Sequence, residues 1–542
     1  MEGDFVRHAR TVSLLTLVSR VLGVLRDASL AFALGTSTPM EAFSVAFSIP
    51  NLLRRLFSEG ALSAAFIPVF TSLNEQDDRE AAQRLANLAI TVLVALLAAL
   101  VLVGEGVVLT WYAFGSPSPR LELTLGLTAV MLPFAIAICL IGLLQAILNV
   151  RGHFAMPAAA PIVLNVFIIA GAVLSAPVFG DSPHVRVYGV ACCVLVAGLA
   201  MVAAHVPPLR RHGLRFRPAW DLASPHLRRV AVLMLPMVVG LGVVQLNVFM
   251  DRIIALGLSG TTTDDGRAIT EFHLLGRTIA YPMKEGAAAV MYYAQRLYQL
   301  PMGVFVVAIG TAIFPALSRH AHHGDDRGLA ETLNRGLRMA MFIALPCTVG
   351  LMLVAEPLVR LMFERGRFSP DDTPRVAALT CVYTAGLVAY AALHLVTRAF
   401  FALQETRLPV KLSAAAAGLN FVLNLVLVWR FGVEGLALST VITAVGQVLV
   451  LVLLLRRRVG RLGLRRFVAS MARTSVATVA MAAAAWGAMR AAAWTGWAEG
   501  STRQAIVLVL AAVVAGAAVF ALAAKVMRMS ELSEVLSRGR TK

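Results

Sequence analysis

The chain has 542 residues, of which 58% are hydrophobic and only 14% charged, and its formal net charge is +18. A soluble domain carries nearer to 25% charged residues, so this composition excludes an ordinary soluble enzyme. The basic residues stand in runs at the ends of apolar segments, such as Arg210-Arg211 and Arg456-Arg457-Arg458. This placement is typical of topology signals and of contacts with anionic lipid, and it argues against a nucleic-acid-binding protein.

Apolar segments long enough to cross a bilayer follow one another along the whole chain, because a helix needs about 20 apolar residues to span the hydrocarbon layer. The pattern predicts an all-α integral membrane protein with about fourteen transmembrane helices. The segments are 11–34, 41–72, 86–114, 122–150, 153–180, 186–209, 230–258, 286–318, 336–363, 376–402, 408–429, 432–455, 468–489 and 504–526.

The second segment is the least regular of the series. Pro50 and the pair Arg54-Arg55 interrupt it, and Pro68 is expected to end it. A broken helix at membrane depth is tolerated where it lines a cavity or is buried in protein. We therefore expect this segment to contribute to an internal site.

The Lys and Arg residues of the loops indicate the orientation in the membrane. With the N-terminus in the cytoplasm, the cytoplasmic loops and both termini hold roughly 28 of them, against about 11 on the other side. Both termini are therefore expected to be cytoplasmic, which requires an even number of spans.

A faint internal repeat relates two stretches six spans apart, 145–168 and 398–423, with Pro and Leu-Asn at similar places. It predicts two pseudo-symmetric six-helix lobes, residues 1–210 and 211–458, and then residues 459–542 with two C-terminal helices and a basic tail. Parallel repeats of this kind place a substrate site between lobes near the midplane. Chance similarity between Ala- and Leu-rich helices is the alternative.

Charged residues inside the predicted spans are the most informative feature. Each costs at least about 2.5–3.5 kcal/mol at mid-bilayer, so it must face a cavity or a partner. Five arginines stand against two acids among the charged residues that matter most here: Arg20, Arg26, Asp27, Arg54, Arg55, Glu59 and Arg296. One interpretation is internal ion pairs, such as Arg26 with Asp27 and Arg55 with Glu59. The other is a cationic pocket of Arg20, Arg54 and Arg296 that binds a phosphate.

Four stretches, taken in chain order, resemble the MurJ (MviN) lipid II flippase family. The first two, Ser19–Asp27 and Phe47–Ala61, are highly specific and look like its opening two spans. Tyr293–Pro301 looks like its eighth span, and Phe401–Lys411 resembles the motif that enters its eleventh.

The resemblance implies a fourteen-span transporter of the multidrug/oligosaccharidyl-lipid/polysaccharide exporter superfamily in a bacterial inner membrane. Its substrate would be lipid II, the undecaprenyl-pyrophosphate-linked disaccharide-pentapeptide, moved outward for peptidoglycan synthesis. The family's essential arginines match Arg20, Arg26, Arg54 and Arg296. Glu41, where Asp is common in the family, is a further expected substrate-binding residue, and so are Asp27, Arg55 and Glu59. The chain also departs from the family in a long polar insert at residues 259–285. The implied groove for the polyprenyl tail lies in the last two spans.

The resemblance also points to an ion site. Asn420 and Asn424 stand four apart on one face of the eleventh span, Thr440 lies on the twelfth and Asp251 on the seventh. Oxygen ligands of this type suit a monovalent cation such as sodium, which would be a coupling ion and not a cofactor of catalysis. Interhelical hydrogen bonding by Asn and Thr, worth about 1 kcal/mol each, is the alternative.

The leading hypothesis is therefore a flippase that works by alternating access as a monomer, with lipid II and membrane lipids as partners. A flippase for another polyprenyl-pyrophosphate-linked sugar is close to it. A drug/cation antiporter of the same fold would favour carboxylates and aromatics in its cavity. A membrane enzyme would need an acidic metal-binding motif or a loop nucleophile, and the sequence contains neither.

Overall fold

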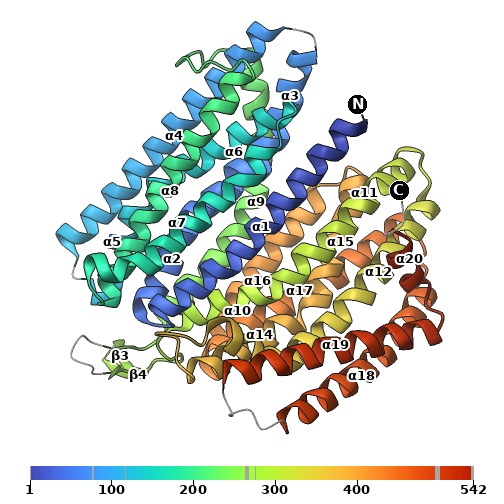
Figure 1. The fold of residues 1–542 in the computed structure, drawn as a ribbon. Helices are drawn as coiled ribbons and strands as arrows, with labels where there is room; N and C mark the ends of the chain where they lie inside the picture. The colour runs from blue at the N-terminus through green and yellow to red at the C-terminus, as the bar shows by residue number, and fades with distance from the viewer. Residues whose placement is uncertain are drawn as a thin grey trace. The chain divides into compact units, whose positions relative to one another are not determined.

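The structure, a computed structural model, describes residues 2–75, 78–115, 117–262, 268–274, 276–494 and 501–538. Nearly all of them are helical (Figure 1). The chain divides into two compact units, the first made of Met1–Ala289 with Arg365–Phe368 and the second of Val290–Glu364 with Ser369–Lys542. The lobe boundaries expected at residues 210 and 458 rest on the repeat and stay a prediction.

The first unit is a helical bundle with one small β insert. Its helices are α1 (Glu2–Leu34), α2 (Thr38–Arg54), η1 (Arg55–Leu62), α3 (Ser63–Glu75), α4 (Arg79–Phe114), α5 (Pro119–Met131), α6 (Phe134–Val150), α7 (Ala155–Phe179), α8 (Pro183–Arg211) and α9 (Pro225–Gly257).

Local sequence explains several of these boundaries. The Asp78 side chain caps α4 by accepting a hydrogen bond from the backbone N–H of Ala81 (2.9 Å), which satisfies one of the unpaired donors of a helix start. Proline opens α5 and α8, where its missing N–H costs nothing. The corner between α1 and α2 contains Gly35 at φ +61°, a conformation that favours glycine.

The second segment is helical without a gap, and the predicted interruption at Arg54-Arg55 is seen only as a change of helix type. Pro50 lies inside α2 and does not interrupt it, contrary to the expectation. After α2, the chain runs as the π-helix η1 and then as α3. Pro68 lies inside α3, which continues to Glu75, so the expectation that Pro68 ends the segment was wrong. A proline removes one hydrogen bond and bends a helix, and flanking turns can carry the helix past it.

Helix packing in the first unit joins segments that are distant in sequence. Helix α7 lies between α1 and α8, and α2 packs on α5 and α6. Helix α9, which the sequence analysis assigned to the second lobe, packs on η1, α2 and α3. This places the residues of α9, including Asp251, in the first unit.

The polar insert folds into two small antiparallel ribbons. Strand β1 (Thr261–Thr262) pairs with β2 (Ala268–Ile269), and β3 (Glu271–Leu274) pairs with β4 (Arg277–Ala280). The insert leads into α10 (Ala287–Pro301), whose first residues belong to the first unit and whose remainder belongs to the second.

The second unit is also a helical bundle. After α10 its elements are η2 (Met302–Val306), α11 (Val307–His322), α12 (Asp326–Leu353), α13 (Ala355–Phe363), α14 (Asp372–Ala385), α15 (Leu387–Ala402), α16 (Arg407–Phe431), α17 (Val433–Val459), α18 (Leu464–Ala493), α19 (Thr502–Val526) and α20 (Ser530–Arg538).

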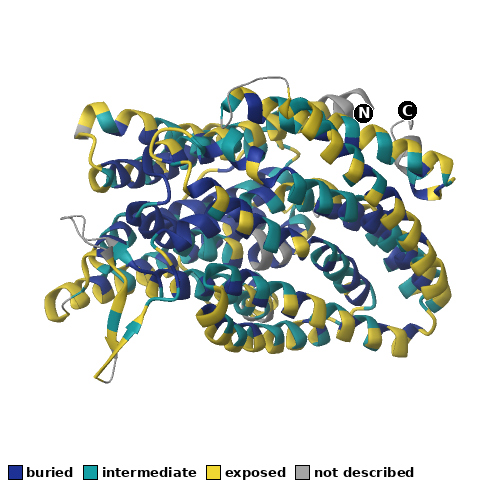
Figure 2. Cartoon of the chain, turned by 90° about the horizontal axis from the view of Figure 1, so that it is seen from below, coloured by how far each residue is buried: buried dark blue, intermediate teal, exposed yellow. Residues whose placement is uncertain are grey.

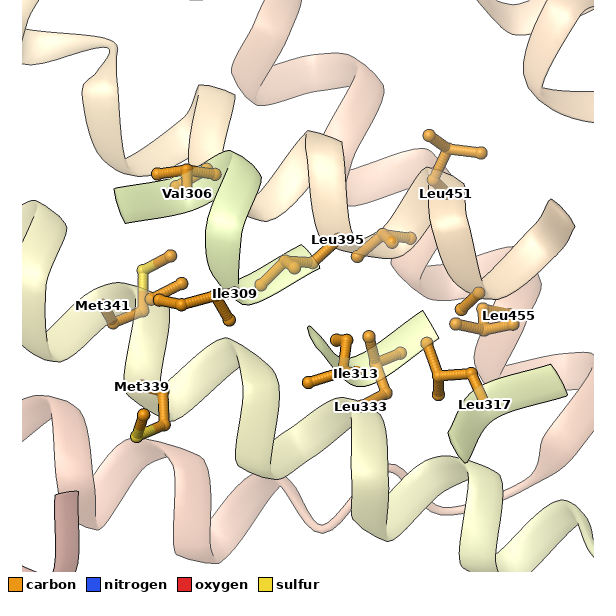
Figure 3. Close-up of a cluster of buried hydrophobic side chains, with 14 of the residues drawn as sticks. Val306, Ile309, Ile313, Leu317, Leu333, Met339, Met341, Leu395, Leu451 and Leu455 are labelled. Carbon is orange, nitrogen blue, oxygen red and sulfur yellow. The ribbon is translucent and has the colours of Figure 1, made fainter. Parts of the chain in front are cut away.

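The core of the second unit gathers around α12. Leu333 of α12, Leu395 of α15 and Leu451 of α17 belong to one buried cluster with Ile309 and Leu317 of α11 (Figure 3). Helices α18 and α19 pack against each other along their lengths, and α18 also packs on α12. The second unit therefore has its own apolar core, as an independent helical bundle requires.

Among the described residues, eleven helices are long and apolar enough to cross a membrane, or twelve if the bent pair α5 and α6 counts as one span. The protein is thus a multi-pass membrane protein, and many large apolar residues of its helices are exposed. Figure 2 shows exposed residues along most of the helices. Each of the fourteen predicted segments coincides, within the described residues, with one helix or with consecutive helices. Helix α1 is not among the eleven membrane-spanning candidates because it contains several charges, and α2 and α3 are too short to be counted. The number of fourteen transmembrane helices therefore stays a prediction.

Candidate functional site

The first polar cluster of the site joins α1 to α7. Arg26 donates from Nε (3.0 Å) and Nη2 (2.8 Å) to Oδ1 of Asp27, and from Nη1 to Oδ1 of Asn165 (3.1 Å). Asn165 in turn donates to the backbone carbonyl of Ser19 (3.1 Å). Asp27 is buried, so the predicted pairing of Arg26 with Asp27 is confirmed. The pair neutralises Arg26 and ties the two helices together.

Arg20 lies on the same helix but in different surroundings. It is seven residues before Asp27, which places the two on one helical face. Its side chain is nevertheless exposed, whereas that of Asp27 is buried. This face of α1 is therefore buried at Asp27 and exposed at Arg20.

Arg54 and Arg55, the two arginines of the second predicted segment, lie where α2 ends and η1 begins. Arg54, at the end of α2, is partly buried, and Arg55 is exposed. Arg55 donates from Nη1 to Oε1 of Gln245 on α9 (3.1 Å). The side chain of Glu59 lies outside the described residues, so its predicted pairing with Arg55 stays a prediction.

Glu41, predicted to contact substrate, is completely buried in the first unit. Its Oε1 accepts a hydrogen bond from the backbone N–H of Ala288, in the first turn of α10 (3.0 Å). Oε2 has no hydrogen-bond partner among the described residues. A carboxylate at this position stabilises a helix N-terminus, because the N–H groups there are unpaired and the dipole is positive.

Arg296, in α10, is the arginine of the second unit. Its guanidinium carbon lies 4.6 Å from the ring centre of Tyr292, a cation–π distance, and the side chain is partly buried. The next residue, Tyr293, is buried against Phe363. The ring of Tyr292 holds the guanidinium in place, and a guanidinium is a planar group that can bind an anion through two hydrogen bonds.

Arg20 and Arg54 belong to the first unit and Arg296 to the second. Their predicted convergence on one cavity stays a prediction.

The proposed ion ligands of the second unit form one hydrogen-bonded ring. Asn424 donates from Nδ2 to Oδ1 of Asn420 (3.0 Å), and Asn420 donates to the hydroxyls of Ser439 (3.2 Å) and Thr440 (3.4 Å). The Ser439 hydroxyl closes the ring on Oδ1 of Asn424. Both asparagines and Ser439 are buried.

This ring offers the oxygen types that a hard monovalent cation takes, and it joins α16 to α17. Its four side chains carry no formal charge. Asp251, the fourth predicted ligand, is buried in α9 of the first unit, so a site shared with the ring stays a prediction. The described residues hold no group of three or more His, Cys, Asp or Glu side chains that could bind a metal ion.

Two residues of these clusters were missed by the sequence analysis. Asn165 is the Leu-Asn asparagine of the first repeat, and Asn420 stands at the similar place in the second, so the repeat could have pointed to it. Ser439 directly precedes Thr440. Nothing in the spacing indicates that the serine, and not the threonine, closes the ring.

Comparison with known proteins identifies the family. The family described as lipid II flippase MurJ matches residues 30–508. A probable lipid II flippase MurJ of Vibrio cholerae is 32% identical over 445 residues, 80% of this chain and 79% of that protein. A lipid II flippase MurJ of Burkholderia cenocepacia is 32% identical over 465 residues, 84% of each.

Solved structures agree on the fold. A lipid II flippase MurJ in an inward closed conformation superposes with a TM-score of 0.72 at 23% identity, covering 95% of this chain and 99% of that one. An inward-facing multidrug-resistance transporter of the MATE family and MOP superfamily gives 0.63 at 14% identity, covering 84% and 98%. The chain therefore belongs to the lipid II flippase MurJ family.

Proposed function

We propose that this protein moves lipid II from the inner to the outer leaflet of a bacterial cytoplasmic membrane by alternating access, as a monomer with both termini in the cytoplasm. The observation that carries the proposal is the match of the MurJ family over residues 30–508. The chain is a transporter and not an enzyme, and a role in peptidoglycan synthesis follows from lipid II as the substrate.

We infer separate tasks for the arginines from their surroundings. Arg26 is occupied by Asp27 and Asn165, so its task is to fix α1 on α7. Arg20 is exposed and Arg54 partly buried, and Arg296 rests on an aromatic ring. The proposed pyrophosphate ligands are therefore Arg20, Arg54 and Arg296, since a planar guanidinium can bind a phosphate through two hydrogen bonds.

The arginines are tested by flipping assays with purified protein in liposomes and by complementation of a flippase-depleted strain. Arg20→Ala or Arg296→Ala should lower flipping at least about tenfold, because each loses a charge-assisted contact with phosphate. Lysine at either position should restore it only in part. The matched control is Arg10→Ala, an exposed arginine of the same helix as Arg20. Alanine variants with full activity would exclude the anion pocket.

The substrate class is tested in the same liposomes. Lipid II should be moved faster than other polyprenyl-pyrophosphate-linked sugars if the chain is specific for it. Equal rates for all of them would favour a broader flippase. Proton- or sodium-driven export of a cationic dye, with no movement of lipid II, would favour the drug/cation antiporter.

We also propose that the α16–α17 ring is the coupling element. Asp251 would supply the one formal negative charge, and Asn420, Asn424 and Thr440 the neutral oxygens, for a sodium ion. The ion can drive transport only if it binds two states of the protein with different affinity. Asp251→Asn should weaken sodium dependence more than Thr440→Val, because it removes charge. Equal flipping in sodium and choline buffers would exclude sodium and leave the proton or the membrane potential as the drive.

The polyprenyl tail is proposed to lie along α18 and α19. Both helices expose large apolar side chains, among them Val476 and Val479 on α18 and Val513 and Val514 on α19. Arginine at Val479 should slow flipping of lipid II and leave a short-chain analogue unaffected, if the tail binds there. Equal slowing of both would assign these residues to ordinary contact with bilayer lipid.

A further inference from the structure

The polar insert between α9 and α10 is tied to itself at its base. The backbone N–H of Gly260 donates to the carbonyl of Met283 (2.8 Å), and that of Tyr281 donates to the carbonyl of Thr270 (2.7 Å). The two ends of the insert therefore lie side by side, and the ribbons extend from a closed base. This organisation differs from a simple long loop.

A buried arginine of another helix binds the first end of the insert. Arg120, in the first turn of α5, is only 8% exposed. Its Nη1 donates to the carbonyl of Leu256 and the hydroxyl of Ser259 (2.7 Å). Its Nη2 donates to the carbonyls of Ser259 and Gly260 (2.8 Å for Gly260).

These acceptors explain why a guanidinium is buried there. Helix α9 ends at Gly257, so the carbonyl of Leu256 is one of those left without a partner at a helix C-terminus. The helix dipole is negative at that end and attracts a cation. The guanidinium presents its donors in a rigid fork that reaches all four acceptors, whereas an ammonium is a compact point charge.

The second end of the insert is held as well. The carboxylate of Glu285 accepts hydrogen bonds from the hydroxyl (2.6 Å) and the backbone N–H (3.2 Å) of Thr38, at the start of α2. The insert thus joins α9, which carries Asp251, to α10, which carries Arg296, and it is fixed at both ends within the first unit.

We propose that Arg120 is a positioning residue for transport. It fixes the end of α9 and the base of the insert, while the ribbons that extend from this base are dispensable for that role. The proposal rests on the proposed lipid II flipping, because its readout is the rate of that process.

The test separates the base from the ribbons. One set of variants changes the anchor, with Arg120→Ala, Arg120→Gln and Arg120→Lys. A second variant keeps the Arg120 contacts and the bond between Gly260 and Met283, and replaces residues 262–281 with Gly-Ser. It removes the ribbons together with the Tyr281–Thr270 bond, and the short linker suffices because Gly260 and Met283 are hydrogen-bonded to each other. The matched control is Arg84→Ala, which removes an exposed ion pair with Asp221 elsewhere in the first unit.

Flipping of lipid II is measured in liposomes as turnover and as the half-saturating lipid II concentration, on protein that remains monodisperse. Each anchor variant should lower turnover at least about tenfold, because buried carbonyls lose their donors, with the half-saturating concentration unchanged. Lysine should not rescue it. The shortened insert and Arg84→Ala should stay within about twofold of the parent. Amide hydrogen exchange at residues 258–260 should rise in the anchor variants alone.

Two results would overturn the proposal. One is a rate of lipid II turnover in Arg120→Gln or Arg120→Lys that equals the rate of the parent protein. The other is a loss in the shortened insert as large as in the anchor variants, which would assign the function to the ribbons. If the parent protein itself moves no lipid II, the proposed function fails, and exchange at residues 258–260 still shows whether Arg120 anchors the insert.

Discussion

Two helix contacts, α1 with α7 and α16 with α17, contain the similarly placed asparagines of the internal repeat but use them differently. In the first, Asn165 binds the charged pair of Arg26 and Asp27. In the second, Asn420 belongs to a ring of neutral amides and hydroxyls. A buried charge demands a fixed partner, whereas neutral groups can exchange partners with one another at small cost. The first contact is therefore suited to hold a helix, and the second to change its bonding when an ion binds.

The largest effect is expected from Asp27→Asn. The change removes the carboxylate that pairs with Arg26, and the loss of one member of a buried ion pair typically destabilises a protein by about 3–5 kcal/mol. The free energy of unfolding in detergent measures it. The double variant Arg26→Gln with Asp27→Asn should recover part of the loss. If the double variant is less stable than Asp27→Asn alone, the two residues do not act as a pair.

A smaller effect is expected from Asn165→Ala. It removes a hydrogen bond to a charged guanidinium, a type worth about 1.5–3 kcal/mol, and leaves the ion pair of Arg26 and Asp27 intact. The same unfolding measurement applies. A loss as large as that of Asp27→Asn would show that the amide, and not the carboxylate, holds the contact between α1 and α7.

Asn424→Ala should cost less again, about 0.6–1.7 kcal/mol, because interhelical hydrogen bonds between neutral groups in membranes lie in that range. Asn424→Asp sharpens the comparison. If the ring binds a cation, the added carboxylate should make both stability and flipping depend more strongly on sodium. If Asn424→Asp is as destabilising as Asn424→Ala at every sodium concentration, the ring is only a structural contact.

The smallest effect is expected from Gln447→Leu. Gln447 donates to the hydroxyl of Ser413 (2.9 Å) between the same two helices, but both side chains are only partly buried. An isolated bond of this kind should be worth about 0.6 kcal/mol, with no change in sodium response. A change in sodium response would extend the coupling element from the ring to the rest of the α16–α17 contact.

Much of the fold could be predicted from the sequence because lipid imposes a simple rule on it. Apolar segments of span length must become helices, since no water is present to satisfy an unpaired backbone. The fourteen segments, the change of helix type at Arg54-Arg55 and the pairing of Arg26 with Asp27 all follow from residues that are near one another in the chain. The expectations for Pro50 and Pro68 were wrong because a proline limits only its own turn.

The sequence by itself thus determined the helices, the membrane setting and the charged residues that need partners. Only the tertiary structure decided which partners they have. Asn165 meets Arg26 across 139 positions, and Arg120 meets Ser259 across 139. Such contacts depend on how the helices pack. Because packing is set by the shapes of many side chains together, the spacing of residues along the chain does not predict which distant residues meet.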